Sequence, residues 1–232
     1  MDTKKRSHRL RALGLALVAS LAIGATSAAS ASALSLTPVA PATYPVSLSL
    51  NAPWEVSFNI GTSGSFPKCE SATGTGQLNS GTTGELKITY KGCGSSSNRC
   101  TSAGQSTGNM VTSSLAVTPV YLNAAKTIWG FKLTPIGTGV FAECTLSGGA
   151  IRISGSVLGN VSTPVGSTMK SFFLHQGWAG WSEQEYQQIE GAGAKYHLEQ
   201  TWFTASGESS LGETALWLEN PITAGASLTI NP

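Results

Sequence analysis

Aspartate is almost absent from this chain of 232 residues, because Asp2 is the only one. An aspartic-protease dyad and an EF-hand calcium loop both need several aspartates, so the sequence excludes these two sites. A serine triad would need glutamate as its third member. Histidine is scarce as well: only His175 and His197 lie beyond the N-terminal leader that is defined below.

Charged side chains are also few, at 11% of the chain, and no run of lysine or arginine follows the leader. Nucleic-acid-binding domains present clustered basic residues, so we expect no nucleic-acid partner. No glycine-rich loop has the strand-to-helix context of a nucleotide site, and we expect no cofactor. The chain is still 41% hydrophobic and contains six tryptophans and seven phenylalanines, which favours a folded core over disorder.

The first 33 residues predict a secretory signal peptide. Five basic residues precede the apolar stretch 12–25, and small-residue A-x-A motifs end at residues 31 and 33. The apolar stretch is too short to cross a bilayer core of roughly 30 Å as a helix. We expect cleavage after Ala33, release to the extracellular side and no transmembrane segment after cleavage. Nine basic and eleven acidic residues would then remain, for a net charge of −2.

Four cysteines remain in the mature chain: Cys69, Cys93, Cys100 and Cys144. An even number of cysteines in an exported protein predicts disulfides. A metal site is not expected, because only one cysteine pair is close in sequence and no histidine lies nearby. No C-x-x-C redox pair is present. Of the three connectivities, we predict Cys93–Cys100 together with Cys69–Cys144, since the polar loop between Cys93 and Cys100 is short.

Apolar residues alternate with polar ones through most of the mature chain, which is typical of half-buried strands. The fold predicted from this pattern is all-β, a single antiparallel β-sandwich or barrel formed by residues 46–232. Residues 34–45 are rich in proline and alanine and predict a linker or an edge segment. At most one short helix is expected, near 182–190, where a serine and a glutamate have capping-box spacing. The predicted strands are 54–60, 85–90, 110–122, 128–135, 140–146, 150–158, 169–175, 195–203, 215–219 and 226–230.

Five segments between residues 66 and 160 carry a resemblance to known proteins. They read KCESATGTGQL, ITYKGC, CTSAGQSTGNM, FAECTL and IRISGSVLG. Together they resemble a group of exported, β-rich actinobacterial proteins without an assigned function. The resemblance implies export, four paired cysteines and an all-β fold, but it implies no catalytic residue.

Two groups of residues are candidates for catalysis. The segment GQSTG at 104–108 matches the G-x-S-x-G nucleophile elbow, but it leads into a strand and lacks the required helix. In the C-terminal segment, alternation places His197 and Glu199 on one strand face, which is also the pattern of an ordinary solvent face. A glutamate pair could support glycoside hydrolysis. The candidates for such a pair are Glu183, Glu185, Glu190 and Glu199.

The tryptophans separate into two groups. Trp54, Trp129, Trp202 and Trp217 lie within apolar strand patterns and are expected in the interior. Trp178 and Trp181 lie among glycine and polar residues, where flat indoles could stack on a sugar or line an apolar cleft. Core packing of this pair is the alternative.

The sequence therefore predicts a secreted or envelope-associated β domain that is not an enzyme. Its expected ligand is a surface glycan or a small apolar molecule, and its expected partner is a cell-envelope or extracellular polymer. One alternative is a purely structural extracellular domain. The other is a hydrolase of glycosidase or esterase type that uses the glutamate and histidine residues of the C-terminal segment.

Overall fold

The alternating segments form strands, and every pairing between them is antiparallel. The computed structural model describes residues 34–53, 55–60, 65–123, 125–176 and 198–232. Within these ranges the chain contains seventeen strands and no helix, so the predicted all-β class is confirmed. The strands are β1 (Ser35–Pro38), β2 (Val46–Ala52), β3 (Val56–Ile60), β4 (Ser65–Cys69), β5 (Ser71–Leu78), β6 (Gly84–Lys91), β7 (Gly94–Ser95), β8 (Asn98–Arg99), β9 (Met110–Val111), β10 (Leu115–Tyr121), β11 (Trp129–Pro135), β12 (Val140–Leu146), β13 (Gly149–Gly155), β14 (Val157–Val161), β15 (Thr168–Gln176), β16 (Leu198–Thr204) and β17 (Gly207–Asn231).

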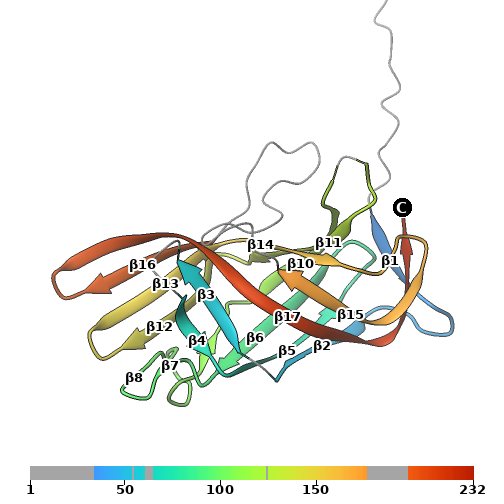
Figure 1. Cartoon of the computed structure of the whole chain (residues 1–232). Coiled ribbons are helices and arrows are strands. Elements are labelled where there is room, and N and C mark those ends of the chain that lie inside the picture. The colour runs from blue at the N-terminus through green and yellow to red at the C-terminus, as the bar shows by residue number, and fades with distance from the viewer. Residues whose placement is uncertain (1–33, 54, 61–64, 124, 177–197) are drawn as a thin grey trace, which may run out of the picture. The chain divides into compact units, whose positions relative to one another are not determined.

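The long strand β17 belongs to two groups of strands (Figure 1). Its first half pairs with β16 and β3, and this group continues through β13 to β12 and through β3 to β4. Its second half pairs with β15, β2 and β1. The sequence predicts two strands here, at 215–219 and 226–230, but the strand is continuous through Pro221. A proline removes only one backbone donor, and the residues on both sides of Pro221 continue to pair.

Eight strands of the second group pair in a circuit that returns to its first member. The order is β17, β15, β14, β11, β10, β6, β5, β2 and again β17. Three of its joints, β14 with β15, β6 with β10 and β2 with β17, comprise only two or three residue pairs. The circuit is therefore a sheet folded over a core in a sandwich-like manner, not a continuously bonded barrel.

The core lies on the inward side of these strands. Leu86, Ile88 and Tyr90 of β6 are buried and alternate with exposed neighbours, as the sequence predicts. Trp129 is also buried, at 1% exposure. Trp202 is half-buried and packs against the edge of the core, so it is less enclosed than the sequence predicts. Its indole lies beside Gly148 and Gly149 in the turn between β12 and β13, at the end of the sheet.

The N-terminal segment 34–45 contributes directly to the sheet. Strand β1 pairs with the last residues of β17, from Leu228 to Asn231. Leu36 is fully buried, and its carbonyl accepts a hydrogen bond from the Tyr44 hydroxyl. This part of the segment is thus an edge strand.

The leader 1–33 and the predicted helix near 182–190 lie outside the described residues. Within the part of the chain that is described, no helix is long and apolar enough to cross a membrane.

Candidate functional site

Most of the residues predicted to act in the C-terminal segment lie outside the described part of the chain. These are Trp178, Trp181, Glu183, Glu185, Glu190 and His197. Glu199 is described: it is exposed on β16, where its Cα partners are Ser154 and Glu213. Leu198 and Gln200 on either side are buried, so the side chains alternate at these three positions, whereas residues 201–204 are all half-buried after a register shift between Gln200 and Thr201. Among the described residues, no three cysteine, histidine or acidic side chains are grouped as a metal site would require.

The GQSTG segment lies in an exposed loop between β8 and β9. Two turns shape this loop, closed by hydrogen bonds from Gln105 N to Ser102 O and from Asn109 N to Ser106 O. No helix follows the segment, which leads into β9. The strand-turn-helix geometry that exposes a nucleophilic serine is therefore missing, and no nucleophile is assigned here.

The four cysteines form two disulfides, but the predicted connectivity is wrong. Cys69 is bonded to Cys93, and Cys100 is bonded to Cys144. Cys93 and Cys100 are the two ends of the β7–β8 hairpin, so each half-cystine lies beside a different neighbouring segment. The hydrogen bond from Glu70 N to Lys91 O brings β4 close to Cys93, and the Thr101–Thr145 bridge brings Cys100 close to β12.

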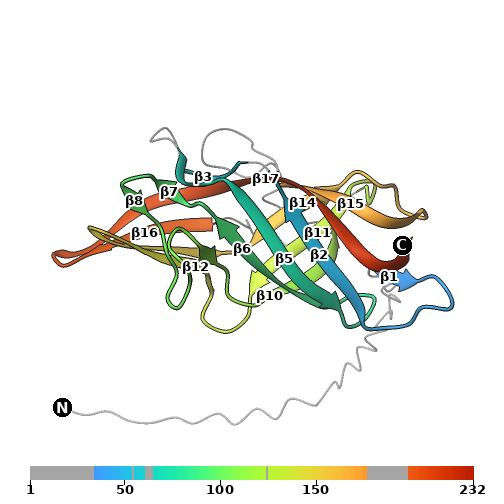
Figure 2. The same cartoon turned by 90° about the horizontal axis from the view of Figure 1, so that it is seen from below.

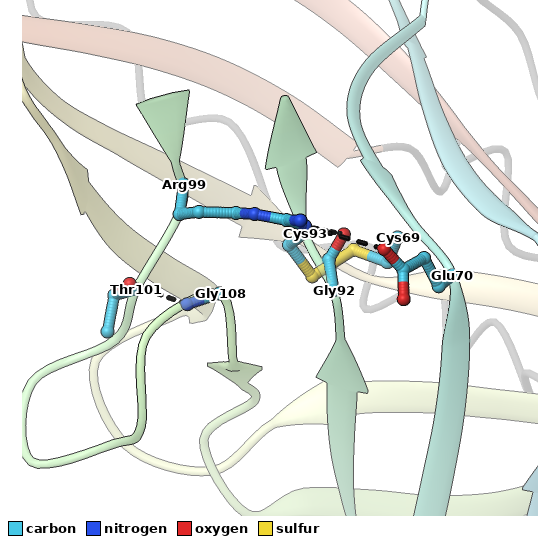
Figure 3. Close-up of polar contacts among 7 residues, drawn as sticks. All are labelled: Cys69, Glu70, Gly92, Cys93, Arg99, Thr101 and Gly108. Carbon is cyan, nitrogen blue, oxygen red and sulfur yellow. Dashed lines mark hydrogen bonds and ion pairs between the residues drawn. A yellow bond between two sulfur atoms is a disulfide. The ribbon is translucent and has the colours of Figure 1, made fainter. Parts of the chain in front are cut away.

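Polar contacts reinforce this cystine-tied region, which we define as residues 69–70, 92–108 and 144–145 (Figure 3). The Arg99 guanidinium donates to the carbonyl of Gly92 at 3.0 Å and pairs with the Glu70 carboxylate at 3.5 Å. Gly108 N donates to the Thr101 hydroxyl at 2.9 Å. All four cysteines are at most 1% exposed. The side chains of Arg99, Glu70 and Thr101 find their partners within this region, which indicates a structural role for these contacts.

A polar groove lies toward the turn of the β5–β6 hairpin, away from the cystine-tied region. Its volume is about 320 Å³, and its lining comes from β5, β6 and Ser114, which precedes β10. Figure 2 shows how strands β5, β6 and β10 are arranged. The polar side chains of the groove are exposed and carry hydroxyl, amide, carboxylate and ammonium groups, whereas Leu86 beneath them is buried. The lining residues are Thr75, Gly76, Gln77, Glu85, Leu86, Lys87 and Ser114.

The register between β5 and β6 positions the polar side chains of the groove. Gln77 lies opposite Glu85, and Thr75 lies opposite Lys87, so the two pairs are adjacent on the outward face. Gly76 lies between them and opposite Leu86. A Cβ atom at Gly76 would overlap the carbonyl oxygen of Glu85 and would lie 2.8 Å from Leu86 Cα. Only glycine permits the two strands to approach this closely.

Glu85 and Lys87 are exposed and form no ion pair among the described residues, as is also the case for Lys91, Lys170 and Glu208. Neither has a hydrogen-bond or ion-pair partner among the described residues. The ion pairs that the described residues form are Lys68–Glu55, Arg99–Glu70 and Arg152–Glu143. The groove thus presents one acceptor carboxylate and one donor ammonium, on neighbouring outward positions of the same strand.

Comparison with known proteins gives no match for this chain, whether against protein-family models, curated proteins or solved structures. The resemblance to exported actinobacterial proteins therefore stays a prediction.

None of the groove residues is predicted as a site from the sequence. Their only signal is the spacing of polar residues at every second position in TGTGQ and ELK, which is common on any solvent face. The site depends on the cross-strand register, which the sequence does not display.

Proposed function

We propose that this protein is an exported, non-enzymatic binding module that holds a glycan of the cell envelope or extracellular space in the polar groove. The observation that carries the proposal is the lining of the groove, where Glu85 and Lys87 have no ion-pair partner among the described residues and lie beside Thr75, Gln77 and Ser114. Ligand sites combine a concave surface with a few convergent polar groups, and this groove has both.

The chemistry of the lining favours a sugar over an apolar ligand. A sugar hydroxyl both donates and accepts hydrogen bonds. The carboxylate of Glu85 accepts, the ammonium of Lys87 donates, and the hydroxyl and amide groups do both. An apolar ligand would leave these groups without partners, which costs free energy. The buried Leu86 alone offers little apolar surface for such a ligand.

Export is supported by two features. The leader has the basic head, apolar stretch and small-residue motifs of a signal peptide. The two buried disulfides suit an oxidising compartment, where such bonds form and persist.

A pull-down on insoluble polymers tests this function. The protein beginning at Leu34 is incubated with peptidoglycan sacculi, chitin, cellulose and starch, and the retained fraction is measured. We expect retention on at least one polymer, with an affinity about tenfold lower for Glu85→Gln and for Lys87→Gln, because each loses a charge-assisted hydrogen bond. Glu208→Gln, at an exposed glutamate on the β16–β17 hairpin, is the matched control and should bind like the wild type.

Two outcomes would refute the proposal. One is the absence of retention on every polymer. The other is retention that is equal for the wild type and both groove variants.

A further inference from the structure

A row of polar side chains crosses five strands and ends at the groove. Its members are direct cross-strand partners: Ser171 of β15 lies opposite Thr223 of β17, Thr223 opposite Ser49 of β2, Ser49 opposite Thr75 of β5, and Thr75 opposite Lys87 of β6. All five are exposed. We call Ser171, Thr223, Ser49 and Thr75 the hydroxyl row. Figure 2 shows β6, β5, β2 and β17 side by side.

The outward surface of β2 and β5, in the middle of the hydroxyl row, carries no charge; the nearest charged side chains are Lys87 at the β6 end and Lys170, which precedes Ser171 on β15. Every outward side chain of β2 and β5 is a serine, threonine, asparagine or glutamine, and neither strand has a charged or apolar one. Gly225 of β17 adds no side chain to this surface, and a Cβ atom at this position would overlap the Ser47 hydroxyl oxygen. No charged side chain of β2 or β5 therefore covers the hydroxyl row.

The hydroxyl groups retain hydrogen-bonding capacity for a ligand. The Ser171 and Thr223 hydroxyls are 3.3 Å apart, and the Ser49 hydroxyl donates to the Thr223 carbonyl at 3.4 Å. Each hydroxyl can donate once and accept twice, so these contacts use only part of its capacity. Four steps between neighbouring strands span roughly 19 Å, which is longer than a disaccharide.

We propose that the hydroxyl row extends the groove into a track for a linear, uncharged polysaccharide that lies across the strands. This inference rests on the proposed function and specifies its ligand. The row is continuous with the groove through Thr75, and its length requires an extended occupant. Its four side chains are hydroxyls without charge, and the two lysines and one glutamate near its ends do not form a patch of one sign, which favours an uncharged polymer over a polyelectrolyte. Hydroxyl and amide side chains recognise such a polymer by hydrogen bonds alone.

The test is the dependence of affinity on chain length, measured by calorimetric titration with β-1,4-linked N-acetylglucosamine oligomers of two, four and six units. We expect the affinity of the wild type to rise at least tenfold from the dimer to the hexamer. The double variant Ser49→Ala/Thr223→Val should bind the hexamer no better than the dimer. Valine retains the β-branched shape of threonine, so the strand is preserved.

Thr145→Val on β12 is the matched control, since Thr145 is exposed on the other group of strands, and it should retain the full length dependence. Affinity that is independent of length, but is reduced by Glu85→Gln, would overturn the hydroxyl row and leave the groove. The hydroxyl row would also be overturned if the affinity of the double variant rose with oligomer length as much as that of the wild type. A dimer of the free protein that the double variant converts to a monomer would assign the row to a second copy of the chain. Absence of binding at every length would overturn the track and the groove site together for this class of glycan.

Discussion

The two ends of strand β6 use polar residues in opposite ways. At its C-terminal end, Arg99 is held by the Gly92 carbonyl and by Glu70, and the Ser102 hydroxyl donates to the Glu143 carbonyl. At the groove end, Glu85 and Lys87 have no such partner among the described residues. Polar groups that satisfy one another stabilise the fold, whereas polar groups without a partner are available to a ligand. From this comparison we infer that the cystine-tied end serves stability, and we propose recognition for the groove end.

The largest effect is expected from removing a disulfide at the cystine-tied end. In the chain-entropy model, a loop of 44 residues between Cys100 and Cys144 contributes about 4 kcal/mol to the free energy of unfolding. Cys100→Ala/Cys144→Ala should therefore lower this free energy by roughly that amount, as measured by urea denaturation. At low temperature, where the variant is still folded, glycan binding at the groove should be unchanged.

Peptide mapping without reduction provides the check on connectivity. It should recover Cys69 linked to Cys93 and Cys100 linked to Cys144. A peptide that links Cys93 to Cys100 would contradict the structure of this region.

A smaller effect is expected at the groove end from Gly76→Ala. The added methyl group would overlap the backbone of β6, so the strands must separate, at a cost of about 1–3 kcal/mol. The displacement should also weaken glycan binding, because Gln77 and Glu85 would no longer be held opposite each other. Gly148→Ala is the control, since its Cβ would meet only the Trp202 ring at 3.9 Å. Equal unfolding midpoints for the two variants would refute the close approach at Gly76.

On its inward side, β6 carries the hydroxyl of Tyr90, which belongs neither to the cystine-tied region nor to the groove. Tyr90 is fully buried with its ring edge-on to Phe58, and its hydroxyl has no hydrogen-bond partner among the described residues. Burial raises the pKa of Tyr90 above its usual value of 10. Above pH 10 the unfolded chain loses this proton while the folded chain keeps it, so the free energy of unfolding falls with rising pH.

Tyr90→Phe removes this dependence. At pH 7 the variant should be as stable as the wild type or more stable by up to about 1 kcal/mol, because an unpaired buried hydroxyl is lost. At pH 11 its advantage should be roughly 1.4 kcal/mol larger than at pH 7. Urea denaturation at the two pH values measures the difference. A constant difference would show that the Tyr90 hydroxyl is paired or hydrated in the folded protein.

Alternation was sufficient to predict the strands with large inward residues, such as β6 with Leu86, Ile88 and Tyr90. It was not sufficient for β5, which is not among the predicted strands. The inward positions of β5 include Gly74 and Gly76, which pair with Leu50 and Leu48 of β2 and with Ile88 and Leu86 of β6. The neighbouring strands leave no room for a side chain at these glycines: a Cβ atom at Gly74 would lie 3.2 Å from Leu50 Cβ, and one at Gly76 would overlap the Glu85 carbonyl oxygen. A small inward residue is thus explained only by its partners, which the sequence does not identify.

The disulfides and the groove could not be predicted for a related reason. The bonded cysteines are neighbours across strands, and the closeness of Cys93 and Cys100 in sequence has no bearing on where their side chains point. Similarly, Thr75 and Lys87 form one surface only because β5 and β6 pair in one register. The presence of paired cysteines was predictable from their even number, but their partners were not.

The smallest changes in the free energy of unfolding should come from substituting one glutamate at each end of β6. Glu70→Gln removes the charge that pairs with Arg99, an exposed contact worth at most about 1 kcal/mol. Glu85→Gln removes a charge that has no partner in the part of the chain that the structure describes, so the free energy of unfolding should change by less than about 0.5 kcal/mol. Binding should show the reverse order, because Glu85→Gln weakens retention on the glycan about tenfold while Glu70→Gln leaves it unchanged. Both variants differ from the wild type by the same chemical change, so solubility or net charge cannot account for a difference between them. If Glu70→Gln weakened binding as much as Glu85→Gln, recognition would extend to the cystine-tied region, and the division of β6 into a structural end and a binding end would be wrong.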